Sequence, residues 1–505
     1  MTAPASSVTD ARTLADLLGG LADVDDRGLY FEGAFVSWRD HLAASRLRAS
    51  ALRGRLDPAR PPHVGVLLPN IPEFSLLFGA AALGGFVLVG LNSTRRGQAL
   101  VDDVLRADCQ LVLVCDETAP LLPNVKSVPT LNIDDPTWTE LLESAPDRTL
   151  GDVSPDDLLM LIFTSGTTGD PKAVRCSQRK FAAPGVMLAD RFGLGSTDVA
   201  YLSMPMFHSN SLIAGWSVAV AAGASIVLRK KFSASGFCDD LRRYGVTYAN
   251  YVGKPLHYVL ATPERDDDAD VSLRIMYGNE AGAADRAEFQ RRFDARVVDG
   301  FGSTEGGVSI TRTPDTPDTA LGPLRAPNAV VDPETGEPSP VGTIGEIVNA
   351  DGPGLFDGYY GDDAATADRL RGGMYRTGDL GWVDADGYVY FAGRIGDWLR
   401  VDGENLGTRP IEQILLRHPL IREATVLGVP AEIGETVGAV LVAPGLDRAS
   451  LDEFLRAQDD LGPKQWPTTV WLTDEVPETA TFKTARAALA ASLGEPSWRS
   501  DPLAG

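Results

Sequence analysis

Short apolar segments, each about as long as one buried strand, recur between residues 63 and 302 of the chain. They are HVGVLLP (63–69), FVLVGL (86–91), CQLVLVC (109–115), ASIVLR (224–229), VTYANYVG (246–253), SLRIMYG (272–278) and ARVVDGFG (295–302). Helix-like stretches such as 38–56 and 237–245 lie among them. Strands that alternate with helices are typical of an α/β fold with largely parallel sheets. Ligands in such sheets bind beyond the carboxyl ends of the strands, so residues that follow these segments are the first candidates for a site.

The chain is too long for one hydrophobic core, because it has 505 residues and single cores stop growing at about 250–300 residues. We therefore expect two or more domains. From about residue 310 the pattern changes to a Pro/Thr-rich loop, TRTPDTPDTALGPLRAP, and then to alternating segments that indicate antiparallel hairpins, with DADG (384–387) as one turn. We place a boundary near residues 394–397, which gives domains 1–394 and 397–505.

The segment TSGTTGDPK (164–172) follows the apolar run LLMLIFT (158–164), which predicts a buried strand. Its hydroxyls, backbone N–H groups and lysine are the groups that phosphate oxygens need. It is not a Walker A loop, since Lys172 stands three residues after Gly169 and Pro171 lies between them. The segment predicts a different phosphate-binding turn, and an ordinary exposed turn is the alternative.

Two later glycine-rich turns each present a carboxylate. GFGSTEGG (300–307) contains Glu305, which is a suitable Mg²⁺ ligand if phosphates lie nearby, because a bare carboxylate would repel them. YRTGDLG (375–381) contains Asp379, and a carboxylate accepts two hydrogen bonds from a ribose diol well. The alternatives are a surface glutamate and an aspartate that caps a turn.

The C-terminal part holds two more stretches of this kind. GRIGDWLRVDGENL (393–406) places Arg394 after a strand and Gly403 in a turn, where a backbone could approach a narrow ligand. VPETATFKTARAAL (476–489) places Lys483 between a threonine-rich loop and a probable helix. Taken alone, a lysine at such a position is normally solvated.

Charge and composition argue against several classes of protein and of binding site. The net charge is −23, from 46 basic and 69 acidic residues, which argues against a nucleic-acid binder with a broad basic face. The four cysteines have no C-x-x-C spacing, so neither a thiolate metal site nor a disulfide framework is expected. The apolar run 76–91 is shorter than the roughly 20 residues of a membrane span and predicts a buried helix, a glycine turn and a strand. The first residues show no signal pattern, so we expect a cytoplasmic protein.

Together the five stretches resemble, in order, the motifs of the adenylate-forming superfamily: acyl- and aryl-CoA synthetases, luciferases and peptide-synthetase adenylation domains. TSGTTGDPK is similar to the phosphate loop, GFGSTEGG to the aromatic-x-x-Thr-Glu motif, YRTGDLG to the ribose motif, GRIGDWLRVDGENL to the hinge-and-thioester motif and TFK to the catalytic-lysine motif. The resemblance runs from about residue 25 to 490. It implies an α/β fold with a large N-terminal domain of parallel-sheet subdomains plus a β-rich subdomain, and a small mobile α+β C-terminal domain.

Other stretches resemble particular branches of the superfamily. VTYANYVGKPLHYVLATP, YGNEAG and GDWLRVDGENLGT resemble the very-long-chain and fatty-acid-transport branch. PPHVGVLLPN, GLNSTRRG, LRKKFSAS, DGFGSTEGG and KQWP resemble actinobacterial acyl-CoA ligases associated with sterol side-chain degradation. This implies an ATP-dependent ligase that adenylates a bulky apolar carboxylic acid, such as a sterol side-chain acid, and transfers the acyl group to CoA. A medium- or long-chain fatty acyl-CoA ligase, a ligase that loads a carrier protein, and a binding protein without turnover are the alternatives.

The resemblance implies a role for each matching position. The phosphate-loop residues Thr164, Ser165, Gly166, Thr167, Thr168, Gly169 and Lys172 would hold the β and γ phosphates of ATP. Asn279, Glu280 and Ala281 would lie along the adenine, with Asp299 near its amino group and Phe301 against its face. Thr304 would contact the α-phosphate, Glu305 would bind Mg²⁺, and Asp379 with Arg394 would grip the ribose.

Two residues would each serve one of the two half-reactions. Lys483 would bridge the substrate carboxylate and the α-phosphate during adenylation, and Gly403 would line the pantetheine tunnel during thioester formation. The C-terminal domain is expected to rotate near Gly396, where many family members carry Asp or Lys. Glycine permits such a rotation at low steric cost. Phe482 precedes the lysine where many relatives have glycine.

Some features keep two interpretations. His208 in SMPMFHSN is either a wall or gate of the acyl pocket or a packed loop residue. Trp216 and the small residues of 217–223 either flank an apolar tunnel or form helix core. The expected partners are the acid, ATP and CoA, with no nucleic acid and no membrane span, and the resemblance is compatible with a homodimer.

Overall fold

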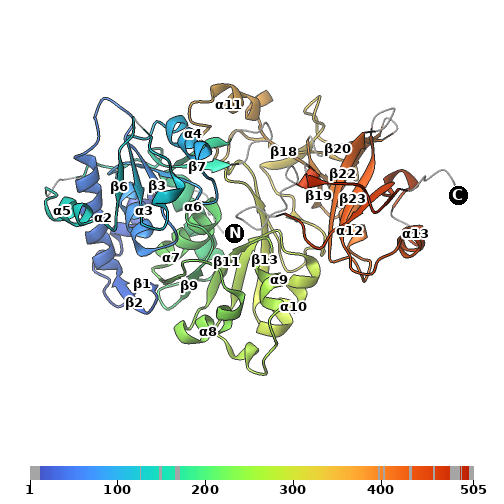
Figure 1. Cartoon of the computed structure of the whole chain (residues 1–505), viewed down its shortest axis with the longest axis horizontal. Helices are drawn as coiled ribbons and strands as arrows, with labels where there is room; N and C mark the ends of the chain where they lie inside the picture. Colours follow the sequence, from blue (N-terminus) through green and yellow to red (C-terminus); the bar gives the residue numbers. More distant parts are fainter. Residues whose placement is uncertain are drawn as a thin grey trace, which may run out of the picture. The chain divides into compact units, whose positions relative to one another are not determined.

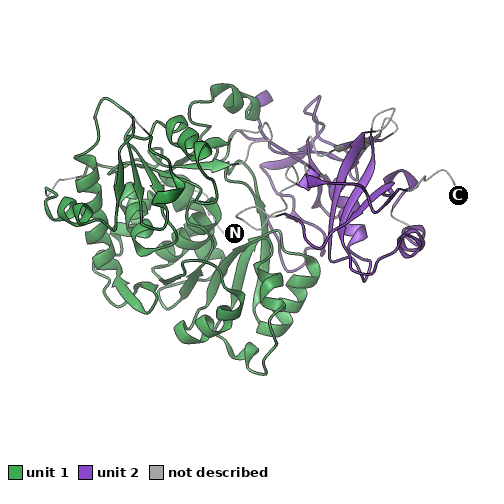
Figure 2. Cartoon of the chain, in the orientation of Figure 1, with its two compact units in different colours: residues 1–309, 353–370 green, residues 310–352, 371–505 purple. Residues whose placement is uncertain are grey.

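The computed structural model describes residues 12–125, 127–146, 150–164, 171–395, 398–401, 404–430, 435–458, 461–477, 489–490 and 492–499. The chain forms two compact units (Figure 2). Unit 1 comprises residues 1–309 and 353–370, and unit 2 comprises residues 310–352 and 371–505. Unit 2 therefore holds residues on both sides of the predicted boundary at 394–397, and the division into domains 1–394 and 397–505 stays a prediction.

Unit 1 contains a six-stranded sheet that is parallel except at one edge. Its strands, in spatial order, are β6 (Thr130–Asn132), β5 (Leu111–Val114), β3 (His63–Leu67), β4 (Val87–Gly90), β7 (Leu158–Thr164) and β8 (Lys172–Ser177). Only β8 is antiparallel to its neighbour. The central strands are buried along their whole length, as their continuous apolar sequences require.

A second sheet of unit 1 is also parallel except at an edge. Its strands run in the order β13 (Arg296–Gly302), β12 (Ile275–Asn279), β11 (Tyr248–Val252), β9 (Val199–Leu202), β10 (Ser225–Leu228), β1 (Gly28–Phe31) and β2 (Ala34–Ser37). All neighbours are parallel except β1 and β2. Beyond β13, β14 (Ser309–Thr311) lies where the chain passes from unit 1 into unit 2.

Helices accompany the strands of unit 1 (Figure 1). They are α1 (Leu14–Gly19), α2 (Trp38–Arg53), α3 (Pro72–Ala82), α4 (Gln98–Arg106), α5 (Pro136–Glu143), α6 (Gln178–Phe192), α7 (Ser217–Ala222), α8 (Ala234–Tyr244), α9 (Pro255–Leu260), α10 (Ala283–Phe293) and α11 (Asp363–Arg369). Short turns of helix are η1 (Ala119–Leu121), η3 (Asp268–Asp270) and η2 (Asn210–Trp216), which is a π-helix. None of the described helices is long and apolar enough to cross a membrane.

The sequence predicted this α/β core, and the prediction is confirmed. Each of the seven apolar segments coincides with one strand of the two sheets, although β12 extends one residue beyond its segment. The run 76–91 is the end of α3, a turn and β4, with Gly84 in the left-handed region at φ +79°. A side chain there would be strained, so the glycine makes the turn possible.

Unit 2 is built largely from antiparallel sheets, with one parallel strand pair in its four-stranded sheet. A five-stranded sheet has the order β15 (Gly322–Pro323), β19 (Tyr388–Arg394), β18 (Tyr375–Val383), β17 (Gly345–Asn349) and β16 (Asn328–Val331). β20 (Trp398–Val401) and β21 (Glu404–Gly407) form a hairpin, and a four-stranded sheet holds β22 (Glu423–Pro430), β23 (Glu435–Val442), β24 (Thr469–Leu472) and β25 (Trp498–Arg499). The helical elements are α12 (Thr408–Leu415), α13 (Arg448–Arg456), η4 (Arg371–Gly373) and η5 (Pro463–Gln465). The predicted hairpin turn DADG joins β18 and β19.

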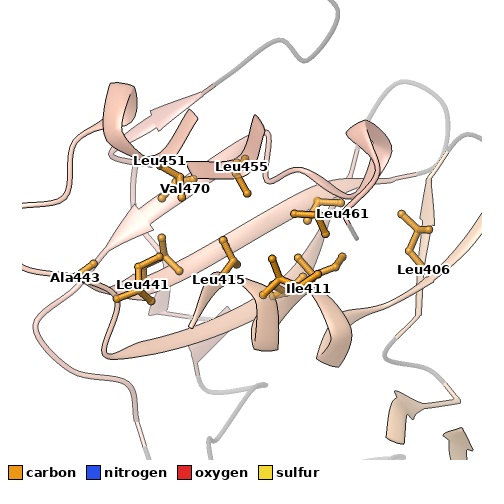
Figure 3. Packing of buried hydrophobic residues seen from close by; sticks show 14 of the residues in the cluster. Leu406, Ile411, Leu415, Leu441, Ala443, Leu451, Leu455, Leu461 and Val470 are labelled. Carbon is orange, nitrogen blue, oxygen red and sulfur yellow. The ribbon is translucent and has the colours of Figure 1, made fainter. Parts of the chain in front are cut away.

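The four-stranded sheet of unit 2 has its own hydrophobic core. Figure 3 shows side chains of α12 and α13 meeting those of the sheet. Ile411 and Leu415 come from α12, Leu451 and Leu455 from α13, and Leu441 and Val470 from β23 and β24; all are at most 2% exposed. Burial of this kind is the main stabilising term for so small a layer of structure.

A buried polar chain joins the helices of unit 1. Trp216 Nε1 at the end of η2 donates to Ser75 Oγ at 2.8 Å, and Ser75 Oγ lies 2.8 Å from His41 Nε2 on α2. The serine oxygen accepts from the indole and also shares a hydrogen bond with the histidine, whose direction depends on the tautomer of the ring. The buried His41 ring is neutral. Burial, and to a smaller extent the Arg48 guanidinium, lower the pKa of His41 to about 3.

We expect this histidine to make stability fall in mild acid. The folded-state pKa lies below the unfolded value of about 6.5, so the unfolded chain binds the proton more readily. The contribution of neutral His41 is complete above about pH 6.5 and is lost toward pH 3, by up to about 1.4 kcal/mol per pH unit. Urea midpoints at pH 7.5 and 5.5 should differ less in His41→Gln than in the wild type. An equal difference would contradict the assignment, and His257→Gln, which changes an exposed ring, is the control.

Candidate active site

The base of the predicted phosphate loop is a strand pair. Thr164 ends β7 and lies opposite Lys172, which begins β8. The predicted strand LLMLIFT is β7 itself. The predicted ligands Ser165, Gly166, Thr167, Thr168 and Gly169 lie outside the described residues. The two described ends therefore place Thr164 and Lys172 opposite each other at the carboxyl end of β7.

Glu305 lies in the turn after β13 and is a buried residue, with 8% exposure. The Tyr359 hydroxyl donates to Glu305 Oε1 at 2.9 Å. Lys180 on α6 donates from Nζ to the backbone oxygen of Glu305 at 2.8 Å and to that of Arg175 at 3.2 Å. Lys180 is 1% exposed, and a buried ammonium is tolerated only with such partners. The glutamate is therefore held through both its side chain and its main chain.

Tyr359 also contacts the predicted phosphate ligand Lys172. The Lys172 Nζ lies 5.3 Å from the centroid of the tyrosine ring, within the range of a cation–π interaction. Burial, followed by the Glu305 carboxylate, raises the pKa of Tyr359 far above its usual value. The phenol therefore stays protonated and remains a donor. Neither Tyr359 nor Lys180 stands in a motif, so the sequence did not reveal them.

The environment of Glu305 fits a Mg²⁺ ion shared with a substrate. Mg²⁺ in phosphate-transfer sites is held by one or two carboxylates together with substrate phosphates and water. Glu305 Oε2 accepts no hydrogen bond from the described residues, so one carboxylate oxygen remains for an ion. Within the described ranges, no three His, Cys, Asp or Glu side chains gather as a complete metal site. The donor set suits an ion that takes its other ligands from ATP and water.

The predicted adenine residues lie in or directly after β12 and β13, which are parallel neighbours. Asn279 ends β12, Asp299 and Phe301 lie in β13, and Glu280 is exposed with φ +69°. The close approach of β12 to β11 requires Gly278, since a Cβ there would lie 2.2 Å from the Tyr251 carbonyl oxygen. The structure thus brings these predicted residues to the carboxyl ends of adjacent strands, and their contact with adenine stays a prediction.

Asp299 is positioned by two residues that no motif indicated. The Tyr251 hydroxyl donates to Asp299 Oδ1, and Arg286 donates to Oδ2 at 3.0 Å. Arg286 also donates to the Ala281 carbonyl at 2.7 Å, which ties the predicted adenine segment to α10. The contact of Tyr251 with Asp299 spans 48 residues of sequence, whereas Arg286 lies 13 residues from Asp299 and 5 from Ala281.

The π-helix η2 brings a further segment to Thr304. Thr304 Oγ1 lies 2.8 Å from the hydroxyl of Ser209, the residue before η2. Asn210, the first residue of η2, donates to Asn279 Oδ1 at 3.4 Å. π-Helices are rare and are frequent at functional sites. The neighbouring His208 ring packs 4.4 Å from that of Phe207, and its role in an acyl pocket stays a prediction.

Trp216 and the small residues after it belong to the helix core. Trp216 is fully buried, donates to Ser75 and packs edge-on against Phe78 at 4.9 Å. Residues 217–220 of α7 are buried as well. Of the two interpretations that the sequence left open, helix core describes residues 216–220, whereas residues 221–223 are half-buried.

Within unit 2, the two predicted ribose residues lie together. Asp379 on β18 and Arg394 on β19 are cross-strand partners, and Arg394 Nε donates to Asp379 Oδ1 at 2.9 Å. The Asp379 side chain is 8% exposed and that of Arg394 is 51% exposed. The strand backbone before Asp379 is held by Glu346, which accepts from Gly378 N at 2.9 Å and from Arg376 at 2.8 Å.

Three further predictions cannot be placed. Gly396, Gly403 and Lys483 lie outside the described residues. Their roles as pivot, pantetheine contact and adenylation lysine stay predictions.

Comparisons with known proteins identify the family. A family model described as AMP-binding enzyme matches residues 22–360, and one described as AMP-binding enzyme C-terminal domain matches residues 410–483. Medium/long-chain-fatty-acid–CoA ligase FadD17 of Mycobacterium tuberculosis is 55% identical over 495 residues, 96% of this chain and 98% of that protein. Steroid-22-oyl-CoA synthetase of Rhodococcus jostii is 42% identical over 520 residues, 98% of this chain and 92% of that protein.

A solved structure shares the fold. ATP-bound MatB from Rhodopseudomonas palustris matches with a TM-score of 0.84 at 26% identity, over 95% of this chain and 98% of that chain. The predicted fold class is thus confirmed. The CoA ligase names of the relatives also confirm the predicted enzyme class, an AMP-forming acid–thiol ligase, whose members use ATP, Mg²⁺ and CoA. The first family model covers more than half of the sequence, and the chain belongs to the AMP-binding enzyme family.

Proposed function

We propose that the protein is an ATP-dependent acyl-CoA ligase for apolar carboxylic acids, with medium- or long-chain fatty acids as the first candidates. The observation that carries this proposal is the 55% identity, over 96% of the chain, to a ligase named for medium and long fatty acids. The buried Glu305, with one carboxylate oxygen held by Tyr359, supports this proposal as well. Adenylation needs positive charge beside the phosphates, and a Mg²⁺ ion bound to Glu305 would supply it.

The chemistry has two steps. The substrate carboxylate attacks the α-phosphorus of ATP, which forms an acyl-adenylate and releases pyrophosphate. The CoA thiol then attacks the acyl carbon, loses its proton and expels AMP. Because the carboxylate and the triphosphate are both anions, the protein must position them and offset their charge.

The described residues would divide the work by position. Thr164 and Lys172 would bind the terminal phosphates at the end of β7, and Thr304 would contact the α-phosphate. Asp379 would accept hydrogen bonds from the ribose hydroxyls, with Arg394 orienting its carboxylate. Glu305 would hold Mg²⁺, which when bound neutralises the charge on the phosphates.

A second candidate substrate is a sterol side-chain acid. The supporting observation is the 42% identity to steroid-22-oyl-CoA synthetase over 98% of the chain. The motif resemblance to ligases of sterol side-chain degradation points the same way. The two candidates share the whole ATP site and would differ only in the acyl pocket.

The test is acyl-CoA formation from ATP, Mg²⁺ and CoA with a panel of straight-chain acids and sterol side-chain acids. We expect kcat/KM to be highest for a medium or long straight chain, and AMP to appear in equal amount to the thioester. A preference for sterol acids would replace the first candidate by the second. Pyrophosphate release without a CoA thioester would overturn CoA as acceptor and indicate a carrier protein.

A further inference from the structure

Residues 353–370 form a separate excursion of the chain within unit 1, between two segments of unit 2. We propose that Tyr359, in this excursion, is a positioning residue that aims Glu305 at the Mg²⁺ of bound MgATP and thereby sets the Mg²⁺ requirement of adenylation. The inference rests on the proposed function, since it assumes that Glu305 binds the ion.

The backbone of the excursion is fixed to the edge of the six-stranded sheet. Arg175 N donates to the Gly358 oxygen at 2.9 Å, and Tyr360 N donates to the Ala173 oxygen at 2.8 Å. Tyr359 itself forms an antiparallel bridge with Val174 of β8. The tyrosine therefore reaches Glu305 from the sheet edge that also carries Lys172, not from a loose loop.

The hydrogen bond between Tyr359 and Glu305 is shielded from water. Tyr359 is 4% exposed and Glu305 is 8% exposed, and the two oxygens are 2.9 Å apart. Arg369 Nε donates to the Tyr359 oxygen at 3.4 Å, so the phenol proton is left for the carboxylate. A carboxylate with one oxygen held in this way presents the other in a fixed direction. Hydrogen-bond partners behind a metal ligand typically change metal affinity about 10- to 100-fold when removed.

The main chain of the same turn is held by a second element. Lys180 binds the Glu305 carbonyl oxygen from α6. The next residue, Gly306, has φ +74°, and a Cβ there would lie 3.3 Å from both the Lys180 Cε and the Leu355 Cβ. Because the backbone cannot rotate freely, the tyrosine hydroxyl decides where the carboxylate points.

The aromatic ring of Tyr359 has a separate task. Lys172 Nζ lies 5.3 Å from the ring centroid, so the ring stabilises the lysine cation that would bind the terminal phosphates. Removal of the hydroxyl alone should therefore affect the ion, whereas removal of the ring should also affect metal-free nucleotide binding. This difference separates a positioning role from a merely structural one.

The neighbouring Tyr360 offers a matched control. Successive residues of an extended segment face opposite ways, and the Tyr360 hydroxyl donates to Asp108 Oδ2 at 2.9 Å while its ring meets that of His63 at 4.8 Å. Tyr360→Phe removes the same atom from the same excursion without touching Glu305.

The experiment compares the wild type with Tyr359→Phe, Tyr359→Leu and Tyr360→Phe. Binding of Mn²⁺ in the presence of ATP is followed by electron paramagnetic resonance, metal-free ATP binding by calorimetry in EDTA, and adenylation by pyrophosphate release across Mg²⁺ concentrations. We expect Tyr359→Phe to raise the half-saturating Mn²⁺ and Mg²⁺ concentrations about ten-fold, with metal-free ATP affinity unchanged and the rate restored by excess Mg²⁺. Tyr359→Leu should in addition weaken metal-free ATP binding, and Tyr360→Phe should match the wild type.

Equal metal dependence in Tyr359→Phe and Tyr360→Phe would overturn the inference, as would a loss of rate that excess Mg²⁺ does not restore. In a Glu305→Gln background, Tyr359→Phe should have no further effect on Mn²⁺ binding, and an additive effect would contradict the proposed route through Glu305. If the wild type neither binds Mn²⁺ with ATP nor releases pyrophosphate with any acid of the panel, the proposed function itself is wrong.

Discussion

The Lys483→Ala variant is expected to lose acyl-adenylate formation by about 10²–10³-fold and to retain thioester formation from supplied acyl-adenylate. In the motif resemblance this lysine bridges the carboxylate and the α-phosphate. Its cation would offset charge that develops only in the first step, so its removal raises that barrier selectively. The second step starts from a mixed anhydride that already carries the activated acyl group. This second step depends on the approach of the CoA thiol and not on the cation of Lys483.

The measurement separates the two steps. ATP–pyrophosphate exchange reports adenylation, and conversion of synthetic acyl-adenylate plus CoA reports thioester formation. The second assay serves as the control that the variant is folded and binds CoA. Equal loss in both assays would show that Lys483 serves the whole site, and the proposed division between half-reactions would be wrong.

The Asp379→Ala variant is expected to lower kcat/KM for ATP by about 100-fold. Hydrogen bonds to a charged group contribute about 1.5–3 kcal/mol each, and the resemblance assigns the ribose diol to this carboxylate. The side chain is 8% exposed and is held by Arg394 at 2.9 Å, so its orientation is set before the nucleotide arrives. Binding then costs little reorganisation.

Comparison of ATP with 2′,3′-dideoxy-ATP makes this test specific. The wild type should discriminate strongly between the two nucleotides, whereas Asp379→Ala should discriminate little, because the partner of the hydroxyls is gone. Asp384→Ala is the matched control: it removes a carboxylate from the turn that joins β18 and β19, where it accepts from Tyr388 N at 2.9 Å. If Asp379→Ala discriminates as the wild type does, the ribose contact lies elsewhere.

Local patterns predicted much of the fold. The run LLMLIFT is strand β7 from Leu158 to Thr164, and the glycine-interrupted run 76–91 is a helix end, a turn and a strand. Both signals arise from burial along a few consecutive residues, which periodicity captures. The π-helix at Asn210–Trp216 gave no such signal, because its pattern of buried residues resembles that of an ordinary helix.

The site residues that the sequence marked carry a local signal, and their roles stay predictions. Short glycine-rich stretches marked Glu305 and Asp379, because their composition is visible in a few consecutive residues. The first stretch is a turn after β13, as predicted, whereas Asp379 lies within strand β18. Tyr359 and Lys180 are 54 and 125 residues from Glu305 in sequence, and they reach it only through tertiary packing. A local sequence pattern cannot predict a contact between residues so far apart in the sequence. The excursion 353–370, which brings Tyr359 into unit 1, was not predicted either.

This excursion has a consequence for the order in which the protein is made. A ribosome releases residues 310–352, which belong to unit 2, before it releases residues 353–370, which belong to unit 1. Domains generally fold as units during synthesis, with the N-terminal one first. Here the first unit remains without Tyr359 until part of the second has emerged. The nascent chain therefore carries Glu305 without its hydrogen-bond donor while a stretch of unit 2 is already outside the ribosome.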